Sequence, residues 1–219
     1  MIVSHRLIVS LKAQDLCVVT RKRDSIEYAT YLRGNMQTAL FDRMTDHELE
    51  RLRTMDYKSL WKDLWMCHAR MMPPDPFVEQ RFERSRSSIP TDVRGCPEPE
   101  WEFPGGRPRG PTETPRECAL REFCEEVGLQ SPNAIEFDDA RNPIAVHHEG
   151  SDGRLYKSVY HWALAERPFE LFPNPREVSL AEWVPFDRAI DRLRSYHHLR
   201  SIFRHRTASF TPVRRALSA

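Results

Sequence analysis

The chain has 219 residues, of which 40% are apolar and 30% are charged, and its formal net charge of +1 points to no particular partner. This length and composition are typical of a globular, soluble protein with one sizeable core. The five cysteines are an odd number without a CxxC pair, which favours reduced thiols over a disulfide framework or a zinc site. The N-terminal residues lack the apolar region of a secretion signal, and no apolar run approaches about 18 residues, so we expect a cytoplasmic protein with no membrane partner.

The first elements are two predicted strands. Residues 6–12 and 16–20 are rich in β-branched and apolar side chains, and a short polar turn separates them. Arg21, Lys22 and Arg23 follow at the end of the second strand. Their positive charge suits contact with a phosphate chain, although a solvated strand end explains them equally well.

Residues 35–97 are predicted to form a helical insertion between two parts of a core, residues 1–34 and 98–219. Thr45 can cap the first inserted helix, and leucines recur at helical spacing after it. We expect a second helix after a break near residue 56. The insertion would therefore have an apolar interior of its own.

Two features of the insertion raise the question of RNA binding. Trp61 and Trp65 lie four residues apart among leucines, which favours core packing over base stacking. A third helical segment, from about residue 77 to residue 86, is rich in basic side chains. Its candidate RNA contacts are Arg81, Arg84 and Arg86.

A capped helix follows a glycine-rich loop in the stretch GGRPRGPTETPRECALREFCEEVGL, residues 105–129. Thr114 can cap this helix, Pro115 fits its first turn, Glu117 completes a capping box, and Gly128 closes it. Apolar residues recur at helical spacing on one side, which we expect to pack on the core. They are Ala119, Leu120, Phe123 and Val127.

A different side of this helix is acidic. At about 100° per residue, Glu122, Glu125 and Glu126 converge within one arc. Like charges at this spacing repel, and a bound cation would neutralise them. Carboxylate oxygens are hard ligands, so Mg²⁺ or Mn²⁺ fits better than zinc. Glu113, just before the helix, is expected to pair with Arg121. The alternative for the three glutamates alone is a solvated acidic face.

The remaining chain is predicted to add strands and a terminal helix. The expected strands are residues 101–104, 135–137, 140–146, 156–165 and 180–185, and the expected helix runs from residue 187 to about residue 203. From Arg192 to Ala219 the chain carries seven arginines and no acidic residue. Such a basic region suits a polyanion, although a solvated helix with a disordered end explains it equally well.

The acidic helix and its loop resemble the Nudix box. The lead from Gly106 to Glu113 is one residue longer than the usual motif, which we interpret as a loop insertion containing Gly110 and Pro111. Further segments resemble, in the same order, the mRNA-decapping Nudix enzymes of poxviruses and asfarviruses. These segments are RDSIEYATYLRGNM, MTDHELERL, LWKDLW, WEFPGGRP and ALREFCEEVGL, and the resemblance covers roughly residues 16–185.

This resemblance implies an α+β fold of the Nudix type, an α/β/α sandwich around a mixed sheet with an inserted helical subdomain that helps to bind RNA. It implies hydrolysis of the cap m7GpppN-RNA to m7GDP and 5′-monophosphate RNA with Mg²⁺ or Mn²⁺. The structural residues of the motif would be Gly106, Glu113, Arg121 and Gly128. The catalytic metal ligands would be Glu122, Glu125, Glu126 and Glu177, where Glu177 is a metal ligand or general base and Glu182 is the fallback.

Several points stay open at this level. In the loop, Arg107 or Arg109 would replace a lysine that the viral enzymes tend to have there. Cap recognition needs an aromatic or arginine face, for which the candidates are Tyr28, Tyr31, Phe77 and Trp101. The competing functions are a Nudix hydrolase of a small nucleotide or a diphosphoinositol polyphosphate, and an inactive RNA-binding module. The oligomeric state is undecided.

Overall fold

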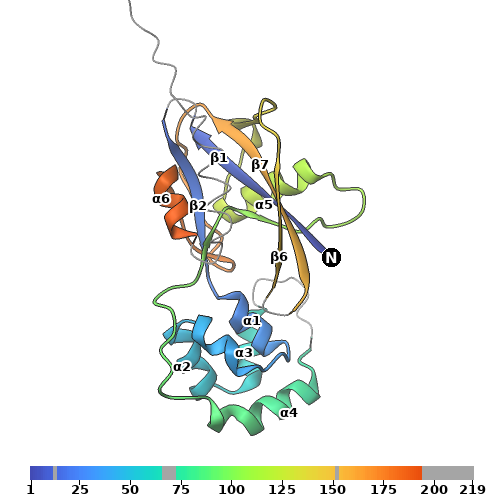
Figure 1. Ribbon diagram of the computed structural model, residues 1–219, viewed down its shortest axis with the longest axis vertical. Helices are drawn as coiled ribbons and strands as arrows, with labels where there is room; N and C mark the ends of the chain where they lie inside the picture. Colours follow the sequence, from blue (N-terminus) through green and yellow to red (C-terminus); the bar gives the residue numbers. More distant parts are fainter. Residues whose placement is uncertain (12–13, 66–72, 151–152, 194–219) are drawn as a thin grey trace, which may run out of the picture.

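The computed structural model describes residues 1–11, 14–65, 73–150 and 153–193. It has a mixed sheet with helices on both faces and a helical lobe at one end (Figure 1). The strands are β1 (Ile2–Leu11), β2 (Leu16–Lys22), β3 (Trp101–Glu102), β4 (Gly105–Gly106), β5 (Ile135–Phe137), β6 (Ile144–Glu149), β7 (Leu155–Ala165) and β8 (Val178–Pro185). The helices are α1 (Ile26–Leu32), α2 (Asp46–Thr54), α3 (Tyr57–Leu64), α4 (Pro76–Ser85), α5 (Pro115–Val127) and α6 (Phe186–Arg192), with 3₁₀ turns η1 (Thr38–Arg43), η2 (Arg86–Ser88) and η3 (Pro132–Ala134).

These elements match most of the expected ones. The strand expected at residues 140–146 begins later, at Ile144, and β6 extends through the two histidines to Glu149. The basic region beyond Leu193 and most of the expected terminal helix lie outside the described residues. Within the described part of the chain, no helix is long and apolar enough to cross a bilayer.

The sheet splits between β1 and β2. β1 runs parallel to β7 along its whole length, whereas it meets antiparallel β2 only at Ser10 and Cys17. β2 then turns toward β8 and β3, and β1 pairs with β4. The segment from Trp101 to Gly106 fills the opening, and the Leu7 amide donates to the Pro104 carbonyl at 2.9 Å. The glycine-rich loop is thereby fixed beside the sheet.

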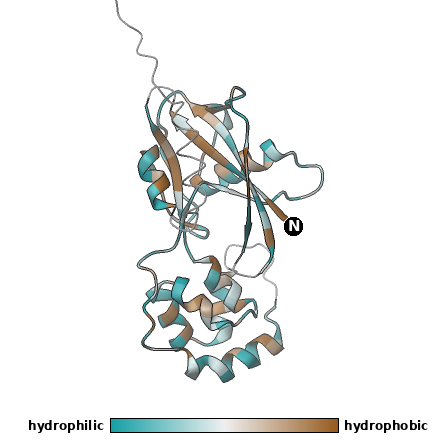
Figure 2. Ribbon diagram, viewed as in Figure 1, coloured by the Kyte–Doolittle hydropathy of each residue, from teal (hydrophilic) through white to brown (hydrophobic). Residues whose placement is uncertain are grey.

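Each face of the sheet packs on a different helix. On one face, Phe123 and Val127 of α5 pack against alternate residues of β1 and β2, among them Leu7 and Val18. On the other face, α6 packs through residues such as Ile190. Figure 2 shows hydrophobic residues along the central strands, between these helices. The predicted α/β/α sandwich around a mixed sheet is therefore confirmed.

The helical lobe has its own core. Its fully buried side chains include Tyr28, Leu49, Tyr57 and Phe82, so α1 packs into the lobe although it precedes residue 35. Trp61 is 8% exposed in this core and Trp65 packs against it, as the helical spacing predicts. The division of the chain into a core and an insertion stays a prediction, although α1, which that prediction assigns to the core, packs with the lobe.

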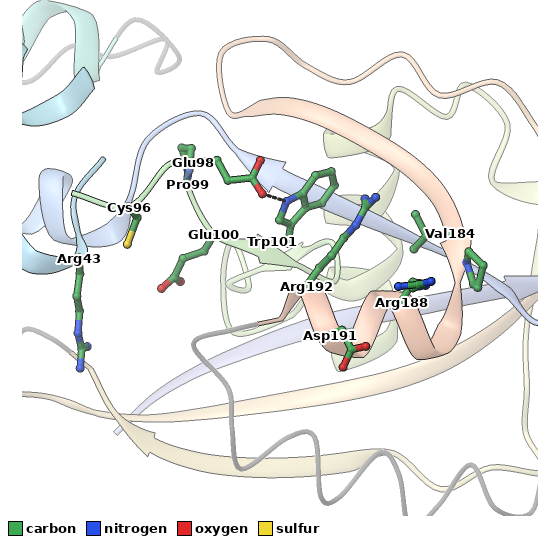
Figure 3. A pocket seen from close by; sticks show the side chains of 11 residues that line it. Arg43, Cys96, Glu98, Pro99, Glu100, Trp101, Val184, Arg188, Asp191 and Arg192 are labelled. Carbon is green, nitrogen blue, oxygen red and sulfur yellow. Dashed lines mark hydrogen bonds between the residues drawn. The ribbon is translucent and has the colours of Figure 1, made fainter. Parts of the chain in front are cut away.

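A cavity of about 710 Å³ lies between the lobe and the α6 face of the sheet (Figure 3). Arg43 of the lobe, Trp101 of β3, and Arg188 and Arg192 of α6 are among its lining residues. The guanidinium of Arg192 lies 4.5 Å from the centre of the Trp101 ring. This cavity is on the opposite face of the sheet from α5.

His5 of β1 and His161 of β7 form a buried pair on the α5 face. Nδ1 of His5 and Nε2 of His161 lie 3.3 Å apart. Burial lowers the pKa of both rings, and with the positive charge of His5 and Arg116 it lowers the pKa of His161 to about 4. Lys157 lowers the pKa of His5 further, whereas Glu113 raises it. Both rings therefore favour the neutral form in the folded protein.

We expect the free energy of unfolding to fall as the pH drops from about 6.5 to about 4. The unfolded chain binds a proton on His161 in this range and the folded protein does not, so the stabilisation is complete above the ordinary pKa of 6.5 and is lost below it. One proton corresponds to at most about 1.4 kcal/mol per pH unit, less with solvent screening. Urea unfolding across this range measures the slope. His161→Gln should flatten the slope, and an unchanged slope would contradict the assignment.

Candidate catalytic site

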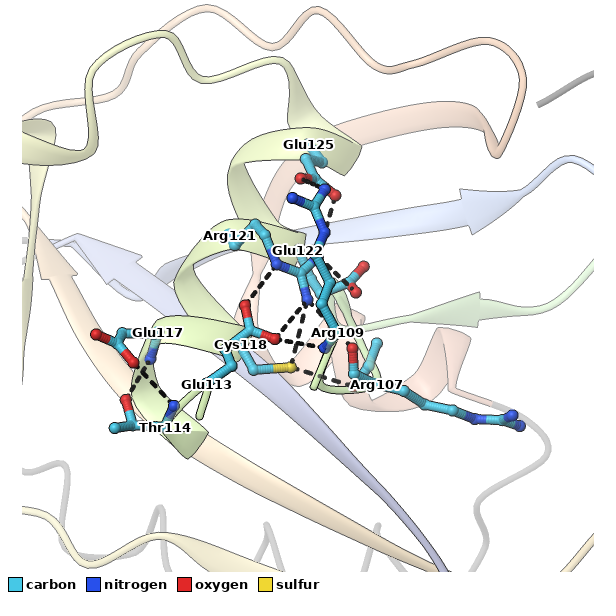
Figure 4. Close-up of polar contacts among 10 residues, drawn as sticks. Arg107, Arg109, Glu113, Thr114, Glu117, Cys118, Arg121, Glu122 and Glu125 are labelled. Atoms are coloured by element: carbon cyan, nitrogen blue, oxygen red, sulfur yellow. Dashed lines mark hydrogen bonds and ion pairs between the residues drawn. The ribbon is translucent and has the colours of Figure 1, made fainter. Parts of the chain in front are cut away.

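Helix α5 is fixed at both ends by local sequence. Thr114 Oγ1 accepts a hydrogen bond from the Glu117 amide at 3.3 Å, and the Glu117 carboxylate accepts one from the Thr114 amide at 2.8 Å. Pro115 occupies the first turn, and Gly128 ends the helix with φ 70°. The expected capping box therefore forms (Figure 4). The helix also ends at Gly128 as expected. Because the apolar side packs on the sheet, the acidic side faces the glycine-rich loop.

Arg121 connects the loop to the acidic side of α5 (Figure 4). Its guanidinium binds both carboxylate oxygens of Glu113 at 2.6 and 3.0 Å, and its NH1 donates to Glu122 at 2.8 Å and to Glu125 at 3.1 Å. It also donates to the Arg107 carbonyl at 3.1 Å. The Arg121 hydrogen bonds hold the pKa of Glu113 at about 2. The expected pair of Glu113 and Arg121 thus forms and neutralises part of the acidic cluster.

Glu122 lies against the backbone of Gly106. A Cβ atom at Gly106 would be 2.4 Å from the Glu122 carboxyl carbon and 2.5 Å from both its oxygens. Burial raises the pKa of Glu122. Glycine at position 106 therefore leaves room for the Glu122 carboxylate where it now lies, and a larger residue would displace it.

Glu126 is 2% exposed and points toward the strands. It accepts hydrogen bonds from Lys22 Nζ at 2.5 Å and from Thr20 Oγ1 at 3.2 Å. Lys22 Nζ also lies 2.7 Å from Glu102, whose other oxygen lies 2.7 Å from Arg6 NH1. Positive and negative groups therefore alternate in the order Arg6, Glu102, Lys22 and Glu126, and their formal charges sum to zero. Burial raises the pKa of Glu126, which Lys22 opposes and Glu102 reinforces.

The sequence reasoning missed Glu102 as a site residue, and it considered Lys22 only as a phosphate contact rather than as a partner of Glu126. Burial alone would lower the pKa of Lys22, but Glu102 and Glu126 raise it above its ordinary value, so the ammonium stays charged. Thr20 and Lys22 have the same strand parity as the buried Val18, which places them on the α5 face. The alternation of side chains along β2 could have placed Thr20 and Lys22 on the α5 face from the sequence. It could not have identified Glu126 as the partner of Lys22, because that depends on how α5 packs on the sheet.

Glu125 lies at the exposed edge of the site. Its carboxylate accepts from Arg109 at 2.5 Å and from Arg121 at 3.1 Å. Arg109 therefore contacts an acidic side chain, whereas Arg107 is exposed and its guanidinium lies 5.8 Å from the Tyr156 ring centre. Arg107 and Arg109 are the two expected replacements for the lysine of the viral loop. Among the described contacts, Arg109 has an acidic partner and Arg107 has none.

The two candidates for a fourth carboxylate lie in different places. Glu182 of β8 pairs with Arg192 of α6, on the face away from α5, which argues against the fallback assignment. Glu177 lies in the turn before β8, and its carbonyl accepts from the Arg23 amide at 3.0 Å. Among the described contacts, none joins the Glu177 side chain to a glutamate of α5. Its assignment stays a prediction.

The donor set suits a hard divalent cation. The acidic side of α5 offers carboxylate oxygens, and a positively charged group balances each of Glu122, Glu125 and Glu126. Across the described residues, however, no three acidic, cysteine or histidine groups already converge as metal ligands. That these three glutamates together hold a metal ion therefore stays a prediction. To bind Mg²⁺ or Mn²⁺, the glutamates must rotate and exchange Arg109, Arg121 or Lys22 for the ion.

The predicted RNA contacts divide into engaged and exposed arginines. Arg21 pairs with Glu98, Arg23 with Asp24, and Arg86 with Glu83. The exposed ones are Arg81, Arg84 and Arg107. Arg81 and Arg84 line a groove on α4 together with Phe77, which is 84% exposed.

Three of the four aromatic cap candidates are buried. Tyr28 and Tyr31 are 0% and 2% exposed within the lobe core, so they offer no face to a ligand. Trp101 is 6% exposed and lies between the guanidinium groups of Arg21 and Arg192. Only Phe77 of these four presents an open ring. The expectation for both tyrosines was wrong because α1 packs into the lobe.

Comparisons with known proteins find viral and bacterial relatives of this chain. A protein of Acanthamoeba polyphaga mimivirus that is named for mRNA decapping is 32% identical over 102 residues, 45% of this chain and 28% of that protein. An isopentenyl-diphosphate Delta-isomerase of Roseobacter denitrificans is 29% identical over 103 residues, 45% of this chain and 49% of that protein. The chain covers less than two thirds of either relative. An mRNA-decapping protein of African swine fever virus is 22% identical over 174 residues, 70% of this chain and 67% of that protein.

A solved structure of an Ap4A hydrolase from C. elegans has the same fold, with a TM-score of 0.52 at 12% identity, covering 95% of this chain and 97% of that chain. The family model of the NUDIX domain matches residues 85–205, more than half of the chain. This match includes the capped helix, its glutamates and the loop that Arg121 holds. The chain belongs to the Nudix family.

Proposed function

We propose that this Nudix protein is an mRNA-decapping hydrolase that converts m7GpppN-RNA to m7GDP and 5′-monophosphate RNA with Mg²⁺ or Mn²⁺. The observation that carries the proposal is the extent of the viral match. The African swine fever virus protein matches 70% of this chain, more than residues 85–205 of the family match, so the viral match extends beyond the segment that the family model covers. The relative's name describes decapping, and the chain has a helical lobe beside its Nudix domain.

The acidic side of α5 would carry the chemistry. Glu122, Glu125 and Glu126 would hold the metal, which supplies neutralisation of phosphate charge and activation of water when bound. Arg121 keeps the glycine-rich loop against the helix through Glu113. These residues belong to one helix and its loop, which limits their relative motion.

Glu177 is the proposed fourth carboxylate, as a metal ligand or general base. The segment before it is tied to the end of α5, because the Phe172 amide donates to the Val127 carbonyl at 2.8 Å and the Asn174 amide to the Glu126 carbonyl at 3.2 Å. The segment that leads to Glu177 is therefore hydrogen-bonded to the backbone of Glu126, a proposed metal ligand. This anchoring supports Glu177 over Glu182.

The exposed surface of α4 is the proposed RNA contact of the lobe. Phe77 offers a ring for base stacking, while Arg81 and Arg84 offer positive charge to phosphates. Arg107 would bring positive charge to the catalytic loop. The engaged arginines, Arg21, Arg23 and Arg86, would have to leave their acidic partners to bind RNA, so we rank them below the exposed ones.

Gly106→Ala is expected to lower the rate of cap cleavage by about tenfold to a hundredfold, because the new Cβ atom displaces the Glu122 carboxylate. Glu122 is a flexible side chain, so the free energy of unfolding should change by less than about 1 kcal/mol. Single-turnover rates and urea unfolding measure the two effects. A variant with the wild-type rate would show that the position of Glu122 does not matter.

The direct test is incubation with RNA that carries a labelled cap phosphate. Release of m7GDP in the presence of Mg²⁺ or Mn²⁺ is the expected result. Cleavage of small dinucleotides or diphosphoinositol polyphosphates, without m7GDP release, would favour the small-substrate hydrolase instead. RNA binding without cleavage of any pyrophosphate would favour the inactive RNA-binding module. Affinity that rises with RNA length and falls steeply with salt would support the RNA surface.

A further inference from the structure

Lys22 holds the most buried glutamate of the site. Its Nζ atom lies 2.5 Å from Glu126 Oε1 and 2.7 Å from Glu102 Oε1, so one ammonium joins carboxylates of α5 and β3. Thr20 Oγ1 donates to the second oxygen of Glu126 at 3.2 Å. Both oxygens of Glu126 are therefore occupied by groups of the protein.

The geometry points to Lys22 as an internal cation that competes with the metal for Glu126 and thereby sets the metal affinity of the site. The inference rests on the proposed function only in taking Glu126 as a metal ligand. An ammonium and a divalent ion both need the negative charge of this carboxylate, and their mutual repulsion prevents close simultaneous binding. Metal entry consequently requires Lys22 to release Glu126.

Glu102 lowers the free-energy cost of moving Lys22 away from Glu126. It lies within 2.7 Å of Lys22 and is 8% exposed, so the ammonium keeps a buried partner after it leaves Glu126. Arg6 NH1 holds the other oxygen of Glu102 at 2.7 Å, which fixes that carboxylate in place. Lys22 is therefore a positioning residue with two partners, of which the metal replaces one.

The first test is a titration of Mn²⁺ into the full chain, with the signal of free Mn²⁺ followed by electron paramagnetic resonance. Lys22→Met removes the competing charge and should lower the Mn²⁺ dissociation constant by about tenfold. Lys22→Arg keeps a competing cation, so it should not bind Mn²⁺ more tightly than the wild type. Lys58→Met is the matched control, because Lys58 is 71% exposed on α3, away from Glu126.

The second test uses the wild-type protein and does not depend on the folding of a variant. Acetylation of individual lysines is followed by mass spectrometry with and without Mg²⁺. Because Lys22 loses one partner when the metal binds, its labelling rate should rise severalfold while that of Lys58 stays constant.

Unchanged Mn²⁺ affinity in Lys22→Met, or unchanged labelling of Lys22, would overturn the inference. If the wild type releases m7GDP but Lys22→Met binds Mn²⁺ no more tightly, the inference fails and the proposed function stands. If Lys22→Met binds Mn²⁺ more tightly but the wild type releases no m7GDP, the proposed substrate fails and the inference stands. A wild-type protein that binds no Mn²⁺ would overturn both.

Discussion

Glu126→Gln is expected to lower the rate of m7GDP release by about a thousandfold and to leave the protein folded. The side chain is 2% exposed and bonded to Lys22 and Thr20, so the isosteric amide still fills the space and still accepts from Thr20. Lys22 keeps Glu102 as its partner. The substitution removes one negative charge from the proposed metal site and turns an amide NH2 group toward Lys22, so we also expect some loss of stability.

Single-turnover kinetics at saturating Mg²⁺ measure the effect of Glu126→Gln. Glu117→Gln provides a matched control on the same helix, because the Glu117 carboxylate accepts from the Thr114 amide at the helix start and faces no metal. It should lose less than about 1 kcal/mol of stability and retain a rate close to that of the wild type. If Glu126→Gln kept more than a tenth of the wild-type rate, Glu126 would not be a metal ligand.

The largest expected loss of stability is that of Gly128→Ala, about 2–4 kcal/mol. Gly128 has φ 70°, a conformation that side chains with a Cβ atom rarely adopt. A Cβ atom there would also be 2.1 Å from the Phe172 carbonyl oxygen, which is backbone and has little freedom to move. The amide of Phe172 is bonded to Val127, so the clash would separate this segment from the end of α5.

Urea unfolding of Gly128→Ala and of a control, Gly110→Ala, tests this account. Gly110 does not have a positive φ, and a Cβ atom there would meet nothing within 4 Å, so its substitution should change stability by less than about 0.5 kcal/mol. Equal stability of the two variants would show that the end of α5 is not constrained as described. Because residue 177 follows the displaced segment, Gly128→Ala should also reduce activity.

The sequence was sufficient where structure depends on neighbours along the chain. The cap at Thr114, the left-handed Gly128 and the pair of Glu113 and Arg121 all formed as expected, because local geometry determines each of them. The α/β/α layers were implied by the resemblance, and the packing on both faces of the sheet confirms them.

Contacts between distant segments could not be predicted in the same way. The partners of Lys22 lie 80 residues or more away in the chain, on β3 and α5, and depend on how the split sheet opens. The burial of Tyr28 depends on α1 packing into the lobe rather than on the sheet. The spacing of the glutamates predicted a shared side of α5, but not the basic side chains that now separate them.

The central claim is that the acidic side of α5 binds a divalent metal. Crystals of the protein soaked in Mn²⁺ test it directly, through anomalous scattering from the metal. We predict a peak beside Glu122, Glu125 and Glu126, with Lys22 withdrawn to Glu102. A map without such a peak, in which these glutamates remain bonded to Lys22, Arg109 and Arg121, would contradict the claim.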